Sequence, residues 1–105
     1  MANLKFEVPH SLSREEAKKR VEALLDSWGR KYGMQAQWVG DRAQLAGKAM
    51  GIRIDAQLEV GEKSVGGEGP DPGMLLRGQA QKYLTRKFTD YLNPSRSLAD
   101  LENED

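Results

Sequence analysis

Residues 52–60 alternate strictly between apolar and polar side chains, and this alternation constrains the fold more than any other feature of the chain. The apolar members of the stretch are Ile52, Ile54, Ala56, Leu58 and Val60. A period of two places them on one face of a β-strand and the intervening polar residues on the other face. Such a strand belongs to an antiparallel sheet with one face in water, so a second layer must cover its apolar face.

Two helical segments flank this strand in the sequence and are the candidates for that second layer. The first follows Ser13 and Glu16, which have the Ser-x-x-Glu spacing of a capping box, and Gly33 suits the left-handed residue that ends a helix. The second follows Asp71, which can cap it, and stops at Asn93 because the proline after it cannot continue a helix. Each segment has an apolar stripe at helical spacing, so each has one face to bury.

Shorter alternating stretches predict the remaining strands. These strands are predicted at residues 4–8, 34–38, 43–47 and 63–65. Loops that begin at Gly40 and Gly61 are short enough to force antiparallel neighbours. The strand near Val65 is the weakest, because Gly66 and Gly67 give it no side chains to pack. The order β-α-β-β-β-β-α therefore predicts an α+β fold, a two-layer sandwich with an antiparallel sheet of four to five strands and both helices on one face.

The sequence predicts one α+β domain over residues 1–93 and an acidic, disordered tail over residues 94–105. A chain of 105 residues supports a single modest core. Its 16 basic and 16 acidic residues cancel overall, and residues 1–92 are only mildly basic. That balance is not typical of a dedicated nucleic-acid-binding protein.

Composition excludes several kinds of site and location. The chain has no cysteine, which excludes disulfides, thiolate zinc sites and cysteine nucleophiles. Its first seven residues contain no apolar core of signal-peptide length, and no apolar run approaches the roughly 18 residues that a membrane span needs. We therefore expect a soluble cytoplasmic protein.

The titratable residues do not form a pattern that indicates catalysis. His10 is the only histidine, and it precedes a helix start without any nucleophile motif, so we interpret it as a turn residue. Asp55 and Glu59 lie roughly 13 Å apart along their strand, which is too far to share a proton or a metal ion. We expect that the protein is not an enzyme and has no catalytic residue, no metal site and no cofactor.

The large apolar side chains are the better candidates for function. The simpler interpretation is that they form the core of the domain. The sharper one is that some line a groove, and that the run at residues 74–76 leaves an exposed apolar patch for a partner. The candidates for such a groove or patch are Trp28, Tyr32, Trp38, Met74, Leu75, Leu76 and Phe88.

Basic side chains recur on both predicted helices and allow a further interpretation. The basic residues concerned are Lys18, Lys19, Arg20, Arg30 and Lys31 on the first helix, and Arg77, Lys82, Arg86 and Lys87 on the second. A solvated helix face explains them better than nucleic-acid binding does. Nucleic-acid binding would require the two basic faces to merge into one stripe.

Several short motifs, taken in their order and spacing, resemble a known family. They are Pro9-His10-Ser11-Leu12-Ser13 with Glu16-Ala17 and Arg20-Val21, the turn Trp38-x-Gly40-Asp41, the strand start from Gly51 to Ile54, and Leu75-Leu76 in the late helix. Over about residues 3–92 the chain is similar to the polyhydroxyalkanoic acid system proteins of bacteria. The resemblance implies an association with polyhydroxyalkanoate synthesis and storage granules, and it implies no catalytic residue. The acidic tail and the apolar-poor strand near Val65 depart from the family pattern.

Two functions of different classes follow as hypotheses. The first is a non-catalytic accessory or binding protein of the polyhydroxyalkanoate system, in which apolar side chains contact a granule surface, a granule protein or the polymer. The alternative is a small domain that binds a hydrophobic ligand between its helices and its sheet. A cavity lined by Trp28, Trp38 and Phe88 would favour the alternative, whereas a filled core with an apolar outer patch would favour the first.

Overall fold

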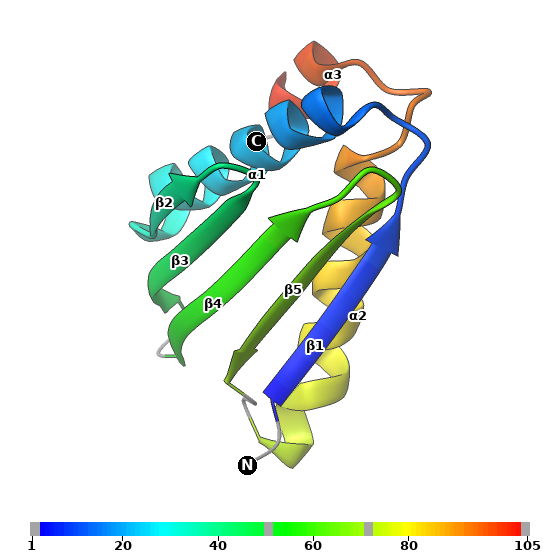
Figure 1. Ribbon diagram of the computed structural model, residues 1–105. Coiled ribbons are helices and arrows are strands. Elements are labelled where there is room, and N and C mark those ends of the chain that lie inside the picture. Colours follow the sequence, from blue (N-terminus) through cyan, green and yellow to red (C-terminus); the bar gives the residue numbers. More distant parts are fainter. Residues whose placement is uncertain (1–2, 50–51, 71–72, 104–105) are drawn as a thin grey trace.

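The computed structural model describes residues 3–49, 52–70 and 73–103. Within them the strands are β1 (Asn3–Pro9), β2 (Gln35–Val39), β3 (Arg42–Ala49), β4 (Ile52–Val60) and β5 (Ser64–Pro70). The helices are α1 (Arg14–Tyr32), α2 (Met74–Tyr91) and α3 (Leu98–Asn103). Up to the end of α2 the order is the predicted β-α-β-β-β-β-α (Figure 1).

The five strands form one sheet in the order β1-β5-β4-β3-β2. Every neighbouring pair is antiparallel. The strand with the strict alternation, β4, lies in the middle, where Leu58 is paired with Ala43 on one side and Gly67 on the other. The sequence predicted this central position because β4 is the longest strand and has a complete apolar face.

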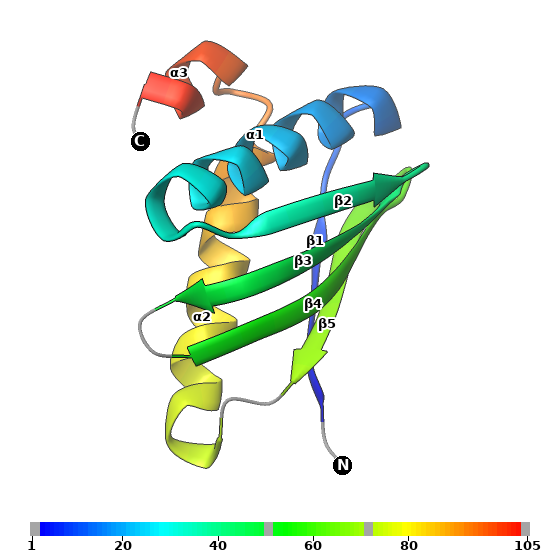
Figure 2. The same cartoon turned by 90° about the vertical axis from the view of Figure 1, so that its left-hand side faces the viewer.

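Both long helices pack on the same face of the sheet, α1 across the β2 and β3 side and α2 behind β1 and β5 (Figure 1, Figure 2). The predicted two-layer α+β sandwich is therefore confirmed. The apolar side chains buried between the layers come from every strand except β2 and from all three helices. They are Val8, Ala17, Val21, Leu24, Leu25, Trp28, Ala43, Leu45, Leu58, Val60, Val65, Phe88, Tyr91, Leu92 and Leu101.

The ends of α1 follow from its sequence. The Ser13 side chain accepts a 3.1 Å hydrogen bond from the backbone N–H of Glu16, as the capping-box spacing predicts. The Glu16 carboxylate does not complete the box, because it accepts a 3.0 Å hydrogen bond from Arg20 one turn later. Gly33 ends the helix at φ 72°, a conformation that favours glycine. The predicted cap of α2 at Asp71 lies outside the described residues, and α2 begins at Met74 after Gly73.

The strand near Val65 is longer and better packed than the sequence predicted. β5 runs over seven residues and is paired along its length with β1 and, over residues 65–68, with β4. A Cβ atom added to Gly67 would collide with the Phe6 ring and lie 2.6 Å from Cδ2 of Leu58. The glycine therefore provides the space that these neighbouring side chains fill. The sequence analysis predicted a weak strand because it considered only that Gly67 has no side chain to pack. It did not consider the neighbouring side chains that pack against the glycine.

The chain after Asn93 is also more ordered than expected. Instead of a disordered tail, residues 98–103 form α3, and Leu101 is fully buried. The Tyr91 hydroxyl donates a 3.4 Å hydrogen bond to the carbonyl oxygen of Leu101. At the start of α3, the Ser97 side chain accepts a 3.1 Å hydrogen bond from the backbone N–H of Asp100. Ser97 and Asp100 have the Ser-x-x-Asp spacing of a helix start, a signal that the sequence analysis did not use.

Candidate functional site

Two of the predicted site residues belong to the core. Trp28 is 5% exposed and Phe88 is fully buried, and their ring centroids lie 6.0 Å apart in an edge-to-face arrangement. Phe6 packs on the other side of Phe88, with ring centroids 4.9 Å apart. Trp28 and Phe88 therefore fill the space between the layers and are not available to a partner at the surface.

Trp38 is half-buried on the edge strand β2. The Lys18 ammonium lies 5.4 Å from the centroid of its ring, within range of a cation–π interaction. One face of the indole is thus covered by a side chain from α1. This arrangement favours a structural role for Trp38 over a place in an open groove.

The structure leaves two of the predicted residues exposed. Tyr32 at the end of α1 is 38% exposed, and Leu76 in the first turn of α2 is 41% exposed. Val39, which the sequence analysis did not single out, is the most exposed large apolar residue among those described, at 82%. Met74 and Leu75 belong to α2, but their side chains lie outside what the structure describes.

Tyr83 of α2 is a neighbour of Tyr32 and lies on the same helix as Leu76. Its ring is stacked at 6.5 Å on Trp28. It lies seven residues after Leu76, which is about two helical turns and roughly 10 Å along the same face of α2. Burial raises the pKa of the Tyr83 hydroxyl above its usual value of 10.0, and neighbouring Tyr32 raises it further. We call Tyr32, Leu76 and Tyr83 the aromatic corner.

The sequence analysis missed Tyr83, although a signal was available. Leu76, Ala80 and Tyr83 have the spacing of one helix face, next to the stripe that faces the core. The stripe that packs on the sheet was assigned, but the face beside it was not considered. Only the position of α1 shows that this second face meets Trp28 and Tyr32.

The end of β3 lies close to the turn between α1 and β2. A Cβ atom added to Gly47 would lie 3.0 Å from the Cα atom of Met34. Met34 and Ile54 are both half-buried against the core. The C-terminal end of α1 and the adjoining ends of β3 and β4 therefore form a continuous surface next to the aromatic corner (Figure 2).

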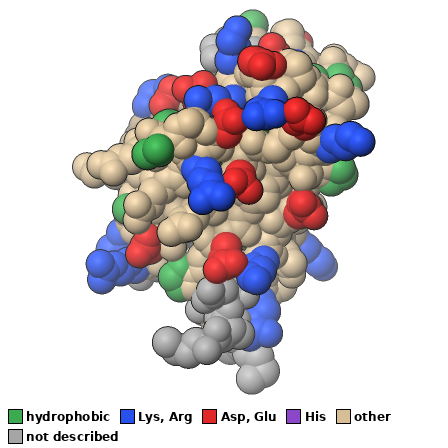
Figure 3. Space-filling view, viewed as in Figure 1, with side chains coloured by type: hydrophobic (Ala, Val, Ile, Leu, Met, Phe, Trp, Pro, Cys, Tyr) green, Lys and Arg blue, Asp and Glu red, His purple; other side chains and the backbone are tan. Residues whose placement is uncertain are grey.

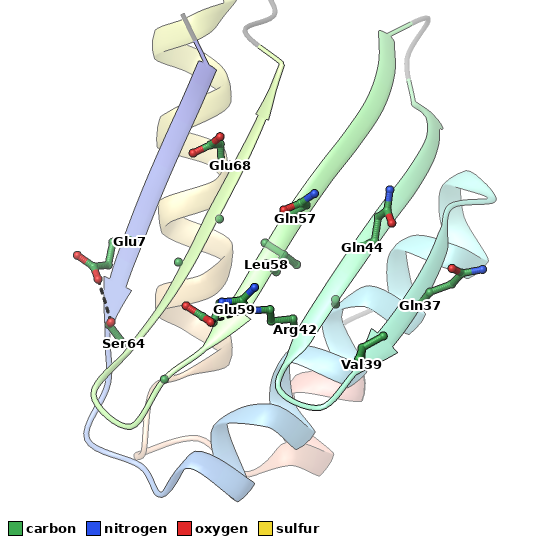
Figure 4. Close-up of a pocket in the computed structure, with 14 residues that line it drawn as sticks. Glu7, Gln37, Val39, Arg42, Gln44, Gln57, Leu58, Glu59, Ser64 and Glu68 are labelled. Carbon is green, nitrogen blue, oxygen red and sulfur yellow. Dashed lines mark hydrogen bonds and ion pairs between the residues drawn. The ribbon is translucent and has the colours of Figure 1, made fainter.

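The opposite face of the sheet is concave and polar. It forms an open hollow of about 580 Å³, covered by neither long helix (Figure 3, Figure 4). Paired positions on neighbouring strands place Gln37, Gln44, Gln57 and Glu68 in one row across it. Figure 3 shows acidic and basic side chains distributed over this face without a cluster of one sign. It has the character of the water-facing side of an antiparallel sheet.

His10 stabilises a turn. Its Nδ1 atom accepts a 3.1 Å hydrogen bond from the backbone N–H of Leu12, so Nε2 carries the proton and donates to the carbonyl oxygen of Gly61 at 3.0 Å. His10 borders a small hollow of about 370 Å³ between the start of α1 and the end of α2. Both ring nitrogens are thus engaged in hydrogen bonds to the backbone.

Other groups of possible chemical importance are dispersed. In the described part of the chain, no three His, Asp or Glu side chains converge into a set that could hold a metal ion. None of the helices described is long and apolar enough to cross a membrane. A domain that binds a hydrophobic ligand would require a cavity lined by Trp28, Trp38 and Phe88. None of these three residues lines either of the two hollows.

The aromatic corner, the polar sheet face and the turn at His10 all lie within residues 4–93. These residues match the family described as "Putative polyhydroxyalkanoic acid system protein". The chain belongs to this family. The membership confirms the resemblance that the short motifs indicated, and the matched segment ends before α3. No curated protein and no solved structure matches the chain.

Proposed function

We propose that this family member is a non-catalytic accessory protein that binds polyhydroxyalkanoate storage granules through the aromatic corner. The observation that carries the proposal is the exposure of Tyr32 next to half-buried Tyr83, with exposed Leu76 two turns away on the same face of α2. Each exposed apolar side chain costs free energy in water, roughly 25 cal/mol per Å², and a partner that covers it recovers that free energy. The polymer and the proteins on its surface both offer apolar area.

The placement of the polar residues supports a non-enzymatic role. His10 holds a turn, and the Arg14 guanidinium bridges Asp41 at 3.2 Å and Glu62 at 2.7 Å. Arg42 and Glu59 form a further exposed ion pair at 2.8 Å on the polar sheet face. These acidic and basic groups thus stabilise loops and strand pairs. Action on granules also implies a cytoplasmic location, which is part of the proposal.

Co-sedimentation with lipid-free polyhydroxyalkanoate particles tests the proposal. We expect the protein to pellet with the particles, and to do so at high salt as well, because apolar contacts are not screened. Replacing both Tyr32 and Leu76 by serine should weaken binding at least tenfold. Val39→Ser is the matched control, since it removes an even more exposed apolar side chain from another part of the surface.

Two outcomes would contradict the proposal. One is that the protein remains in the supernatant at every particle concentration. The other is that Val39→Ser weakens binding as much as the double variant does, which would mean that apolar exposure anywhere on the molecule is sufficient. Thermal unfolding of each variant establishes that the loss does not come from unfolding.

A further inference from the structure

Acidic and basic residues are segregated along this chain although they balance overall. Three segments, residues 27–34, 46–54 and 73–89, hold eight of the 16 lysines and arginines and none of the 16 acidic residues. The basic residues in these segments are Arg30, Lys31, Lys48, Arg53, Arg77, Lys82, Arg86 and Lys87. The nearest acids in the sequence are Asp26, Asp55, Asp71 and Asp90, each within two residues of the end of a segment.

The fold brings these three segments to one side of the molecule. The first is the C-terminal end of α1, the second comprises the adjoining ends of β3 and β4, and the third is α2 (Figure 2, left). The first two segments meet where Met34 lies close to Gly47. The first and third segments meet where the Tyr83 ring stacks on Trp28. We call this surface the cationic side, and it contains the aromatic corner.

The bordering acids offset part of the positive charge of these segments, since Asp26 and Asp90 lie one helical turn from Arg30 and Arg86 and Asp55 lies two residues from Arg53. These bordering acids are fewer than the eight basic residues of the segments. The molecule measures 34 × 26 × 26 Å, and at physiological salt charges interact over a Debye length of about 8 Å. The acids in the loops at the other end of the sheet include Asp41 and Glu62, which are already paired with Arg14. A partner at the cationic side therefore experiences the local positive charge and not the zero net charge of the chain.

Basic residues in the first half of α1 do not extend this surface. Arg20 is buried and donates hydrogen bonds to backbone carbonyls at the end of α2. Lys18 lies over the Trp38 ring. The cationic side therefore includes the basic residues at the C-terminal end of α1 and on α2, but not Arg20 or Lys18.

We propose that the cationic side binds an anionic lipid interface, with the aromatic corner entering the apolar layer and the surrounding lysines and arginines contacting the headgroups. This inference rests on the proposed function and specifies the surface that the protein meets. Exposed leucine and tyrosine surrounded by basic residues are the combination that adsorbs to anionic lipid, because apolar burial and headgroup attraction add. Nucleic acid would use the positive charge but would leave Leu76 without a partner.

Flotation with lipid vesicles tests the inference on the full chain. We expect binding to phosphatidylcholine vesicles that contain phosphatidylglycerol, and at least tenfold weaker binding to phosphatidylcholine alone. The charge-reversal pair Arg30→Glu with Arg86→Glu should weaken binding to the anionic vesicles by about tenfold or more. Lys19→Glu with Lys63→Glu is the matched control, because it changes net charge equally at exposed positions outside the cationic side and should change binding by less than about twofold.

Several results would overturn the inference. These are the absence of binding to anionic vesicles, equal losses in the two charge-reversal pairs, or tighter binding to a DNA or RNA duplex than to the vesicles. Binding to lipid-free polymer particles without binding to anionic vesicles would overturn the inference and leave the proposed function standing. Binding to neither would overturn both.

Discussion

Nη1 of Arg20 donates a 2.7 Å hydrogen bond to the carbonyl oxygen of Asn93, so a buried side chain of α1 caps the end of α2. The same nitrogen lies 3.3 Å from the carbonyl oxygen of Tyr91, and Nε donates to the Glu16 carboxylate. The last carbonyls of a helix lack partners within it, and a cation is stabilising there. Arg20 therefore holds the two helices together through polar bonds as well as packing.

Replacing Arg20 by alanine should lower the free energy of unfolding by about 3 kcal/mol, because buried carbonyls and a carboxylate lose their donor. Urea denaturation of the variant provides the measurement. Arg30→Ala is the control, since Arg30 is exposed on the same helix and its loss should cost less than about 0.5 kcal/mol. Equal stability of the two variants would show that the Arg20 bonds contribute nothing.

Gly67→Ala should destabilise the protein by about 1–3 kcal/mol, because the new methyl group would collide with the Phe6 ring and with Leu58. Gly66→Ala is a matched control on the neighbouring residue. A Cβ atom there would meet only the carbonyl oxygen of Phe6, at an ordinary 3.6 Å. Thermal unfolding of both variants compares them directly, and a Gly67→Ala protein as stable as Gly66→Ala would refute the close packing across β5.

His10→Ala should lower the free energy of unfolding by about 1–2 kcal/mol, since two hydrogen bonds are lost and the Leu12 N–H and the Gly61 carbonyl lose a partner. His10→Asn separates the two bonds. Its shorter side chain can still accept from the N–H two residues later, but it does not reach Gly61. Chemical denaturation should rank the three proteins with asparagine between histidine and alanine, and an unchanged alanine variant would contradict a structural role.

The raised pKa of Tyr83 predicts how stability depends on alkaline pH. Folding favours the protonated hydroxyl, so the unfolded chain loses this proton at lower pH than the folded protein does. The stabilisation that comes from this pKa shift is fully present below pH 10.0, the usual pKa of tyrosine. It is lost as the pH rises through the higher pKa of the folded protein. The free energy of unfolding should therefore fall more steeply above pH 10 in the natural protein than in Tyr83→Phe. Parallel profiles for the two proteins would contradict the burial of this hydroxyl.

Patterns within single elements were enough to predict most of the fold. The alternation in β4 identified the central strand and its apolar face, and the spacing of Ser13 and Glu16 located the start of α1. These signals depend on neighbours within one strand or one helical turn, and they are present in the sequence before any tertiary contact forms. Motif order also identified the family, which the match over residues 4–93 confirms.

The candidate site was predicted less completely. The list of seven apolar residues contained two core rings, Trp28 and Phe88, because the sequence shows that a side chain is large and apolar but not which layer covers it. Tyr83 was missed because its importance comes from Trp28, which lies on a different helix. The tail was misjudged for the same reason, since Leu101 is ordered by the core that it enters.

The sequence by itself determined the elements up to the end of α2, their order and the apolar face of the central strand and of α1, because periodicity and capping are local properties of the chain. Only the tertiary structure decided that Gly67 makes room for Phe6, that Arg20 caps α2, and that three acid-free segments meet beside the aromatic corner. Each of these depends on groups far apart in the chain. Their meeting is set by how the two layers pack, which no local pattern specifies.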